Sequence, residues 1–218
     1  MDARDLAAAR RDYALGGLDE SDLAPEPMAM FERWYADAVS AGIHEPNAMA
    51  VATATPDGVP SLRFVLLKGF DAGPDGGFVF YTNQASRKGA ELAANPRVAL
   101  LFPWHPLERQ VRVEGTAAPV SRAEVDAYFA RRPRGSRLGA WASHQSEVVS
   151  GRAELETAYA EAERRFEGVE EIPPPEEWGG YRVTPEVVEF WQGRTGRMHD
   201  RLVYRLAEDG WATERLAP

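Results

Sequence analysis

Residues 48–68 read AMAVATATPDGVPSLRFVLLK, and they predict the first hairpin of a sheet. Residues 48–55 and 59–68 are rich in apolar and β-branched side chains, and Pro56-Asp57-Gly58 between them has the composition of a tight turn. Alternation along the second strand puts Arg63 on one face and Lys68 on the other, each among apolar neighbours. A cation on a half-buried strand needs an anionic partner, or it must reach solvent from the strand end.

The rest of the chain alternates further strands with helices. We expect strands over residues 78–82, 98–102, 109–120, 181–183, 187–192, 201–206 and 211–215. We expect helices over residues 3–15, 30–39, 86–95 and 153–166, and one that starts at the capping box of Ser121 and Glu124 and ends before Pro133. This pattern indicates an α+β fold with a predominantly antiparallel β sheet or barrel. Because no break in composition separates strands from helices, we predict one domain over residues 1–218.

Composition excludes several classes of protein. The 218 residues include no cysteine, which rules out disulfides, thiolate metal sites and cysteine nucleophiles. The four histidines are too scattered for a zinc site, so we predict no metal. Apolar runs reach only about five residues, too short to span a bilayer, and the charged N-terminus does not resemble a secretory signal. These features predict a cytoplasmic protein.

The charge is unevenly distributed along the chain. The net charge of −9 argues against a general nucleic-acid binder. Residues 63–137 nevertheless hold 12 Lys/Arg and 7 Asp/Glu, a net charge of +5. Of the 25 basic residues only Lys68 and Lys88 are lysines, and both lie in this segment. The middle of the chain is therefore suited to an anionic ligand.

Two motifs in this segment have the chemistry of phosphate sites. Ser86-Arg87-Lys88 opens a helix after a strand, and cations there oppose the helix dipole unless an anion is bound. Tyr128 and Arg132 share one helix face, and Ser136 follows just after the expected end of that helix. The alternative for the second motif is a solvated basic helix end, which the dipole favours.

A third candidate lies near the C-terminus. On an extended segment Arg197, His199 and Arg201 fall on one face, which favours an anionic or electron-rich ligand. Gln110 on an expected strand has both a donor and an acceptor for the edge of a heterocycle, although an exposed strand glutamine is the simpler interpretation.

Long motifs along the chain resemble one known family. RFVLLK, VFYTNQASRKGAEL, NPRVALLFPWHPLERQVRVEG, YFARRPRGSRLGAWASHQS, WGGYRV, EFWQG, RMHDR and RLAP occur in the order found in the pyridoxine/pyridoxamine 5′-phosphate oxidases. The resemblance covers residues 10–218. It implies an FMN-binding split β-barrel with flanking helices, and a homodimer with FMN at the subunit interface. It also implies an N-terminal segment, residues 1–27, that is mobile and can fold over the substrate.

The resemblance also implies roles for individual residues. It assigns FMN to Arg63, Phe64, Val65, Leu66, Leu67, Lys68, Tyr81, Thr82, Arg87, Lys88, Gln110, Gln145, Ser146, Trp191 and Arg201. It assigns the substrate to Arg10, Tyr13, Lys68, Tyr128, Arg132, Ser136, Arg197, Met198 and His199, with Arg197 and His199 in the catalytic role. The chain departs from the family pattern at Asp12, at Met198 and in the loop over residues 193–196.

The implied activity is the oxidation of pyridoxine 5′-phosphate or pyridoxamine 5′-phosphate to pyridoxal 5′-phosphate, with O2 as acceptor and H2O2 as product. FMN and the substrate each carry a phosphate, which agrees with two basic motifs. The alternatives are a flavin- or deazaflavin-dependent reductase on the same fold, and a non-catalytic binder of flavin or nucleic acid. A phosphate site built from Tyr128, Arg132 and Ser136 argues against the reductase.

Overall fold

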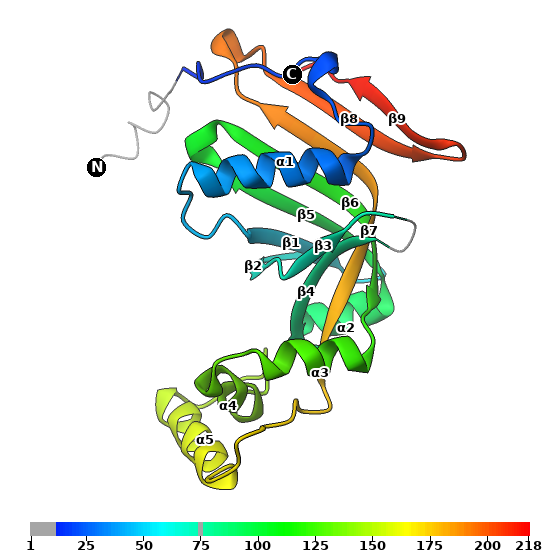
Figure 1. Ribbon diagram of the computed structural model, residues 1–218. Coiled ribbons are helices and arrows are strands. Elements are labelled where there is room, and N and C mark those ends of the chain that lie inside the picture. The colour runs from blue at the N-terminus through cyan, green and yellow to red at the C-terminus, as the bar shows by residue number, and fades with distance from the viewer. Residues whose placement is uncertain (1–11, 74–75) are drawn as a thin grey trace. The chain divides into compact units, whose positions relative to one another are not determined.

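The computed structural model describes residues 12–73 and 76–218, which fold mainly into an antiparallel sheet with flanking helices (Figure 1). The strands are β1 Ala48–Ala54, β2 Pro60–Leu66, β3 Gly69–Asp71, β4 Gly77–Asn83, β5 Arg97–Trp104, β6 Arg109–Pro119, β7 Trp178–Gln192, β8 Asp200–Ala207 and β9 Gly210–Arg215. The helices are α1 Pro27–Ser40, α2 Arg87–Ala94, α3 Arg122–Ala130, α4 Arg134–Ala142 and α5 Arg152–Arg165. Short 3₁₀ turns cover Glu20–Asp22, His105–Leu107 and Thr195–Arg197.

Within the described residues the strands hydrogen-bond in the order β2-β1-β5-β6-β7-β4-β3. Strand β8 also pairs with β7, and β9 pairs with β8. The pairs β3–β4, β4–β7, β7–β8 and β8–β9 are antiparallel. The prediction of an α+β fold with an antiparallel sheet is confirmed. No helix in this part of the chain is both long enough and apolar enough to cross a membrane.

The described part of the chain divides into two compact units. The first unit comprises the described residues of Met1–Met49 with Leu100–Glu114 and Pro185–Pro218. The second comprises Ala50–Ala99 and Gly115–Thr184. The single domain over residues 1–218 and the mobility of residues 1–27 stay predictions.

Aromatic side chains make up a large part of the core of the first unit. Phe31 of α1 packs against Phe102 at a ring-centroid distance of 4.8 Å, and Trp34 lies edge-on to Phe190 at 5.2 Å. Both α1 residues are buried, at helical spacing that the sequence predicts. Buried Tyr204 donates its hydroxyl to the Ala24 carbonyl at 2.7 Å, which fixes the approach to α1.

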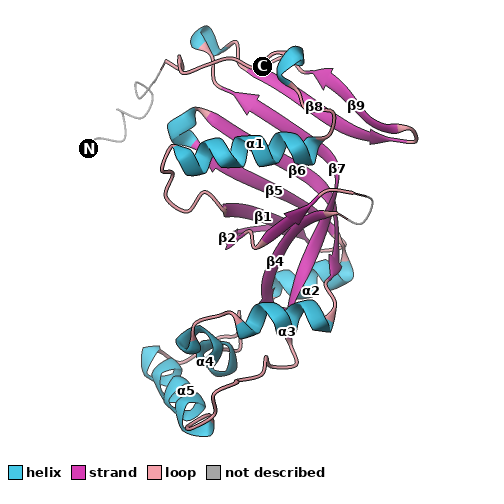
Figure 2. Cartoon of the chain, in the orientation of Figure 1, coloured by secondary structure: helices cyan, strands magenta, loops and turns pink. Residues whose placement is uncertain are grey.

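One hydrophobic core cluster of the second unit is formed by residues of α3, α4 and α5, the segment that follows α5, and Trp178. Helices α4 and α5 pack side by side (Figure 2). Phe129 and Trp178 meet edge-on at 4.7 Å in this core. The predicted capping box opens α3: Ser121 accepts from the Glu124 backbone, and the Glu124 carboxylate accepts from Ser121. Tyr128 lies in the last turn of α3, and Arg132 lies two residues after Ala130, the last residue of the helix.

Three predictions for individual helices and short strands were wrong or incomplete, and a fourth concerns β7. Residues 12–15, the described end of the predicted first helix, are not helical, because the Ala14 and Leu15 N–H groups donate to the Glu108 carboxylate. Helix α4 was missed, because Pro133 ends α3 and also precedes the first turn of the next helix. The three-residue strand β3 was also missed.

Strand β7 is continuous where the sequence predicted two strands. Pro185 lies between the segment paired with β4, residues 178–183, and the segment paired with β8, residues 187–192. The missing proline N–H therefore removes no bond from either of these ladders.

Candidate active site

The second unit contains a basic cavity of about 810 Å³, which is within the range of small-molecule sites. Its lining includes five basic residues and no Asp or Glu; the five are Arg63, Lys68, Lys88, Arg131 and Arg132. Of the predicted site residues, the lining contains Arg63, Phe64, Val65, Leu66, Lys68, Tyr81, Thr82, Lys88, Tyr128, Arg132, Ser136 and Gln145. The structure thus brings together residues from both predicted phosphate motifs.

Lys88 is a buried cation held only by neutral acceptors. Its Nζ donates to Thr82 Oγ1 at 2.9 Å, to Ser86 Oγ at 3.1 Å and to Gln145 Oε1 at 2.5 Å. Burial, followed by the nearby Arg63 guanidinium, lowers the pKa of Lys88 from 10.5 to about 8. No carboxylate pairs with Lys88 within residues 12–73 and 76–218. An anion in the cavity would complete this site.

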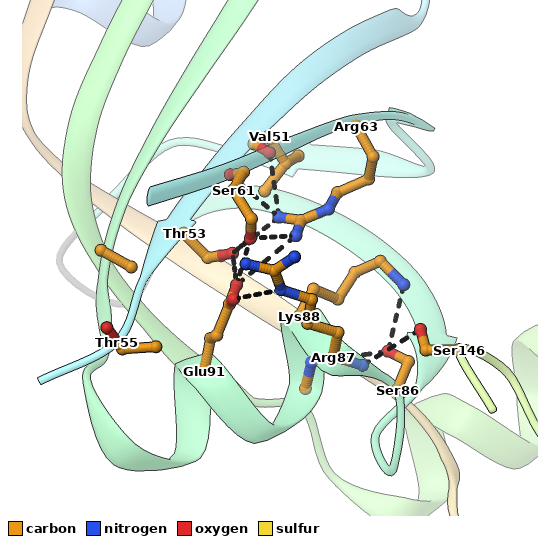
Figure 3. Close-up of polar contacts among 12 residues, drawn as sticks. Val51, Thr53, Thr55, Ser61, Arg63, Ser86, Arg87, Lys88, Glu91 and Ser146 are labelled. Atoms are coloured by element: carbon orange, nitrogen blue, oxygen red, sulfur yellow. Dashed lines mark hydrogen bonds and ion pairs between the residues drawn. The ribbon is translucent and has the colours of Figure 1, made fainter. Parts of the chain in front are cut away.

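Arg87 differs from Lys88, because the fold provides it with a carboxylate. We expected Arg87 to require an external anion, but its Nε donates to Glu91 Oε1 at 2.8 Å, one helical turn away (Figure 3). Arg63 also reaches Glu91, with Nη2 at 3.4 Å from Oε2. A carboxylate that the sequence analysis overlooked therefore already neutralises part of this cluster.

The N-terminus of α2 is also less open than the sequence suggested. The Arg87 N–H donates to Ser146 Oγ at 3.1 Å, and the N-cap Ser86 accepts from the Gly89 N–H at 3.4 Å. Ser146 adopts a left-handed backbone with φ of 79°, a strained conformation for serine that is typical of functional sites. The predicted residues Arg87, Lys88, Gln145 and Ser146 are thus linked by hydrogen bonds.

A stack of parallel aromatic rings forms another part of the cavity wall. The Tyr81 and Tyr128 rings lie 4.0 Å apart with an interplanar angle of 6°, and Trp178 is parallel to Tyr81 at 5.7 Å. Arg132 lies 4.7 Å from the centroid of the Trp178 ring. The Arg132 Nη1 is buried and has no hydrogen-bond partner among the described residues, which is unusual for a guanidinium nitrogen. Like Lys88, Arg132 is suited to an anion in the cavity.

Ser136 lies inside α4, and not after the end of a helix as expected. It still lines the same cavity as Tyr128 and Arg132. Trp178 and Arg131 also line this cavity and were not singled out from the sequence. Leu67 is buried and is not part of the lining.

Three predicted residues of the first unit form an aromatic cluster. Tyr13 lies edge-on to Trp191 at 5.8 Å and 5.7 Å from His199, and Trp191 and His199 are 4.6 Å apart. A side chain at Gly193 would collide with Tyr13, since an added Cβ would lie 2.8 Å from its ring. The His199 Nδ1 accepts from the Arg194 N–H at 3.1 Å, so the neutral imidazole carries its proton on Nε2.

The prediction that Arg197, His199 and Arg201 share one face of an extended segment is wrong. Thr195–Arg197 forms a 3₁₀ turn and Arg197 has φ of 62°, so the segment is not extended there. Arg197 and Met198 are exposed. Arg201 instead pairs with buried Glu189 at 2.8 and 3.0 Å, so the fold itself supplies the anion expected for it.

The remaining predicted site residues lie in the first unit or outside the described residues. Gln110 lies on β6 in the first unit, with Trp191 on β7 and Arg201 on β8. Arg10 lies outside the described residues. In the described part of the chain no three His, Asp or Glu side chains gather in a way that would hold a metal ion.

Comparison with known proteins identifies the family. The model of the family described as pyridoxamine 5′-phosphate oxidase matches residues 35–166, and that of the pyridoxine 5′-phosphate oxidase C-terminal dimerisation region matches residues 178–218. A pyridoxine/pyridoxamine 5′-phosphate oxidase of Nocardioides sp. is 67% identical over 98% of both chains.

Two solved structures are similar to this one. The structure of PhzG from Burkholderia lata 383, in complex with tetrahydrophenazine-1-carboxylic acid, has a TM-score of 0.85 and 34% identity over 92% of this chain and 98% of that chain. A pyridoxamine 5′-phosphate oxidase-related, FMN-binding protein from Nostoc punctiforme has a TM-score of 0.69 and 18% identity over 90% of this chain and 100% of that one. The second likeness confirms the predicted split β-barrel fold. The chain belongs to the pyridoxine/pyridoxamine 5′-phosphate oxidase family, whose members are oxidoreductases.

Proposed function

We propose that the protein binds FMN and oxidises pyridoxine 5′-phosphate or pyridoxamine 5′-phosphate to pyridoxal 5′-phosphate, with O2 as acceptor and H2O2 as product. From pyridoxamine 5′-phosphate the reaction also consumes water and releases ammonia. The observation that carries this proposal is the pair of buried cationic groups lining one cavity, Lys88 Nζ and Arg132 Nη1. Neither is paired with a carboxylate in the described residues. A phosphorylated cofactor and a phosphorylated substrate would together supply two anions.

The residues present fit FMN. The donors around Lys88 suit its phosphate, and residues 63–66 of β2 with Thr82 and Gln145 line the same cavity. Ser146 is not part of the lining and accepts from the N–H of Arg87, the residue before Lys88. We assign FMN to the residues that the family resemblance implies in the second unit, and to Gln110, Trp191 and Arg201 of the first. When bound, FMN supplies the two-electron acceptor that the side chains of this chain lack.

The chain's own residues would bind and orient the substrate. Lys68, Tyr128, Arg132 and Ser136 would hold its phosphate, so that binding energy away from the reacting carbon fixes the substrate's position. Arg197, Met198 and His199 would contact its reacting end and ring, and Tyr13 and Arg10 would cover it. Because His199 Nδ1 is occupied by the Arg194 N–H, only Nε2 remains to donate to a ligand.

We also propose a homodimer in which FMN is contacted by both subunits. The match of residues 178–218 to a C-terminal dimerisation region supports this assembly. Those residues include Trp191 and Arg201, which are among the assigned FMN residues. A sedimentation mass near that of one chain, measured with FMN bound, would contradict the dimer.

Anaerobic reduction of the bound flavin tests the proposed activity. We expect each vitamer 5′-phosphate to bleach the flavin absorbance, and air to restore it with release of peroxide. Tetrahydrophenazine-1-carboxylic acid and reduced nicotinamide cofactors serve as comparison donors. Bleaching by a nicotinamide but by neither vitamer phosphate would favour the reductase, and bleaching by no donor would favour flavin storage.

A further inference from the structure

The cluster at the start of α2 contains one carboxylate for three cations. Arg63 lies on β2, and Arg87, Lys88 and Glu91 lie in the first turns of α2 (Figure 3). All four residues belong to the second unit. The proposed function uses the three cations as donors to FMN. It gives no role to Glu91, although the Glu91 side chain is only 5% exposed.

Glu91 is held from four directions. It accepts from the hydroxyls of Thr53 and Ser61, from Arg87 Nε at 2.8 Å and from Arg63 Nη2 at 3.4 Å. Burial alone raises the pKa of Glu91, but the hydrogen bonds from Ser61, Thr53 and Arg87 outweigh burial and lower the pKa to about 2. The carboxylate is therefore ionised throughout the neutral range.

The two arginines depend on Glu91 to different degrees. Arg63 has further partners, since its Nη1 donates to Thr53 Oγ1 at 2.6 Å and to the Val51 carbonyl at 3.1 Å. The Arg87 side chain is 60% exposed, and Glu91 is its one side-chain partner among the described residues. Loss of the carboxylate would leave Arg63 in place and release Arg87.

The charges of the cluster can be compared with those of a phosphate group. With Lys88 protonated, the three cations and Glu91 give a net charge of +2. A phosphate monoester carries about −1.5 to −2 near neutral pH. Without Glu91 the cations would repel one another in a partly buried site when no ligand is bound.

We propose that Glu91 is a specificity-determining residue that acts as a resident counter-anion: it stabilises the cofactor-free cluster and limits its attraction for phosphate by competing for Arg63 and Arg87. This inference rests on the proposed placement of the FMN phosphate at Lys88. Glu91 keeps the three cations together before the cofactor binds. It also leaves a charge that a single phosphate monoester balances.

The experiment compares FMN with riboflavin, which lacks the phosphate, on the full-length apoprotein. For Glu91→Gln we expect the ratio of FMN affinity to riboflavin affinity to rise about tenfold, because one negative charge close to the phosphate is removed. We also expect the melting temperature of the apoprotein to fall and the increase on adding FMN to become larger. A purely structural role would weaken both ligands equally and leave the ratio unchanged.

Variants that restore the net charge of the cluster distinguish an electrostatic role of Glu91 from a packing role. Arg87→Gln lowers the net charge to +1 and should reduce the ratio, and the double variant Arg87→Gln/Glu91→Gln restores +2 and should return the ratio to near the wild-type value. Glu91→Asp keeps the charge and should also stay near wild type, even if Glu91→Gln folds poorly. Glu156→Gln is the matched control, since that carboxylate pairs with Arg152 at 3.1 Å, also one helical turn away, outside the cluster.

The measurements distinguish failure of the Glu91 role from failure of the proposed function. If wild-type apoprotein does not prefer FMN to riboflavin, the phosphate placement fails. If the wild type prefers FMN but Glu91→Gln leaves the ratio unchanged or lowers it, the counter-anion role is overturned. A double variant that stays as selective as Glu91→Gln would also overturn it.

Discussion

Replacing Lys88 with methionine tests the cofactor site most directly. The substitution keeps a long unbranched side chain and removes the ammonium. The neighbouring groups retain partners, because Thr82 Oγ1 still donates to Gln145 at 3.0 Å and Ser86 Oγ still donates to the Asn83 carbonyl at 2.7 Å. A buried cation without a carboxylate is also lost, so we expect the apoprotein of Lys88→Met to be at least as stable as the wild type.

The affinity for FMN should fall while that for riboflavin does not. A hydrogen bond to a charged group contributes about 1.5–3 kcal/mol, which corresponds to about a 10- to 150-fold loss of FMN affinity. Flavin fluorescence titrations of the apoprotein with both ligands measure the two affinities. Equal losses for FMN and riboflavin, or an unchanged FMN affinity, would refute the placement of the phosphate at Lys88.

The same lysine predicts a pH dependence with a definite sign. Because burial lowers the pKa of Lys88 in the ligand-free fold to about 8, the ammonium loses its proton as pH rises through that value. FMN affinity should therefore decline above about pH 8, and FMN binding near that pH should take up a proton. The stability of the ligand-free protein should change with pH in the opposite direction. Unfolding restores the ordinary pKa of Lys88, so the unfolded chain holds the proton more tightly than the folded protein does. The contribution of Lys88 to the free energy of unfolding therefore rises with pH between about 8 and 10.5. Lys88→Met should abolish both dependences.

The remaining predictions concern the substrate, the N-terminal segment and the core. Arg132→Met should raise the Michaelis constant for pyridoxamine 5′-phosphate while the FMN content stays unchanged, and steady-state kinetics of the FMN-loaded variant check this. Glu108→Ala removes the acceptor of the Ala14 and Leu15 N–H groups, which should release neighbouring Tyr13; a double-mutant cycle with Tyr13→Ala on kcat/KM should then give effects that do not add. Tyr204→Phe leaves the buried Ala24 carbonyl without its donor and should cost about 1–3 kcal/mol, measured as a melting temperature lowered by about 2–4 °C per kcal/mol.

Local chemistry explains which parts of the fold were predictable. The hairpin over residues 48–68 and the capping box at Ser121 were placed to within a residue or two, because alternation, turn composition and the cap are short-range signals. Helix α4 was missed for the same reason: Pro133 is locally a stop signal, and only the packing of Leu138 in the core of the second unit distinguishes it from the start of a new helix. Strand β7 passes Pro185 because two different partner strands pair on either side of it, which no local pattern reveals.

The candidate site shows the same limit in its electrostatics. From the sequence, Arg87, Lys88 and Arg201 are equally expected to need an anion, since each is a cation in an unfavourable position. In the fold Arg87 finds Glu91 and Arg201 finds Glu189, whereas Lys88 finds only neutral oxygens. The Arg87 pair could have been predicted, since residues four apart face each other on a helix.

A cation suggests a ligand only where the fold withholds a carboxylate, and that depends on contacts between distant parts of the chain. Glu91 is held by Thr53 and Ser61, 38 and 30 residues away along the chain, and no spacing rule predicts these contacts. Of the cations that line the cavity, Arg132 also meets this criterion, because its Nη1 is buried and has no hydrogen-bond partner in the described residues. Lys88 and Arg132 therefore carry the argument for two bound phosphates, and the arginines with internal partners do not. If Lys88→Met impaired only FMN binding and Arg132→Met only substrate binding, the two cations would belong to two separate anion sites, as one phosphorylated cofactor and one phosphorylated substrate require.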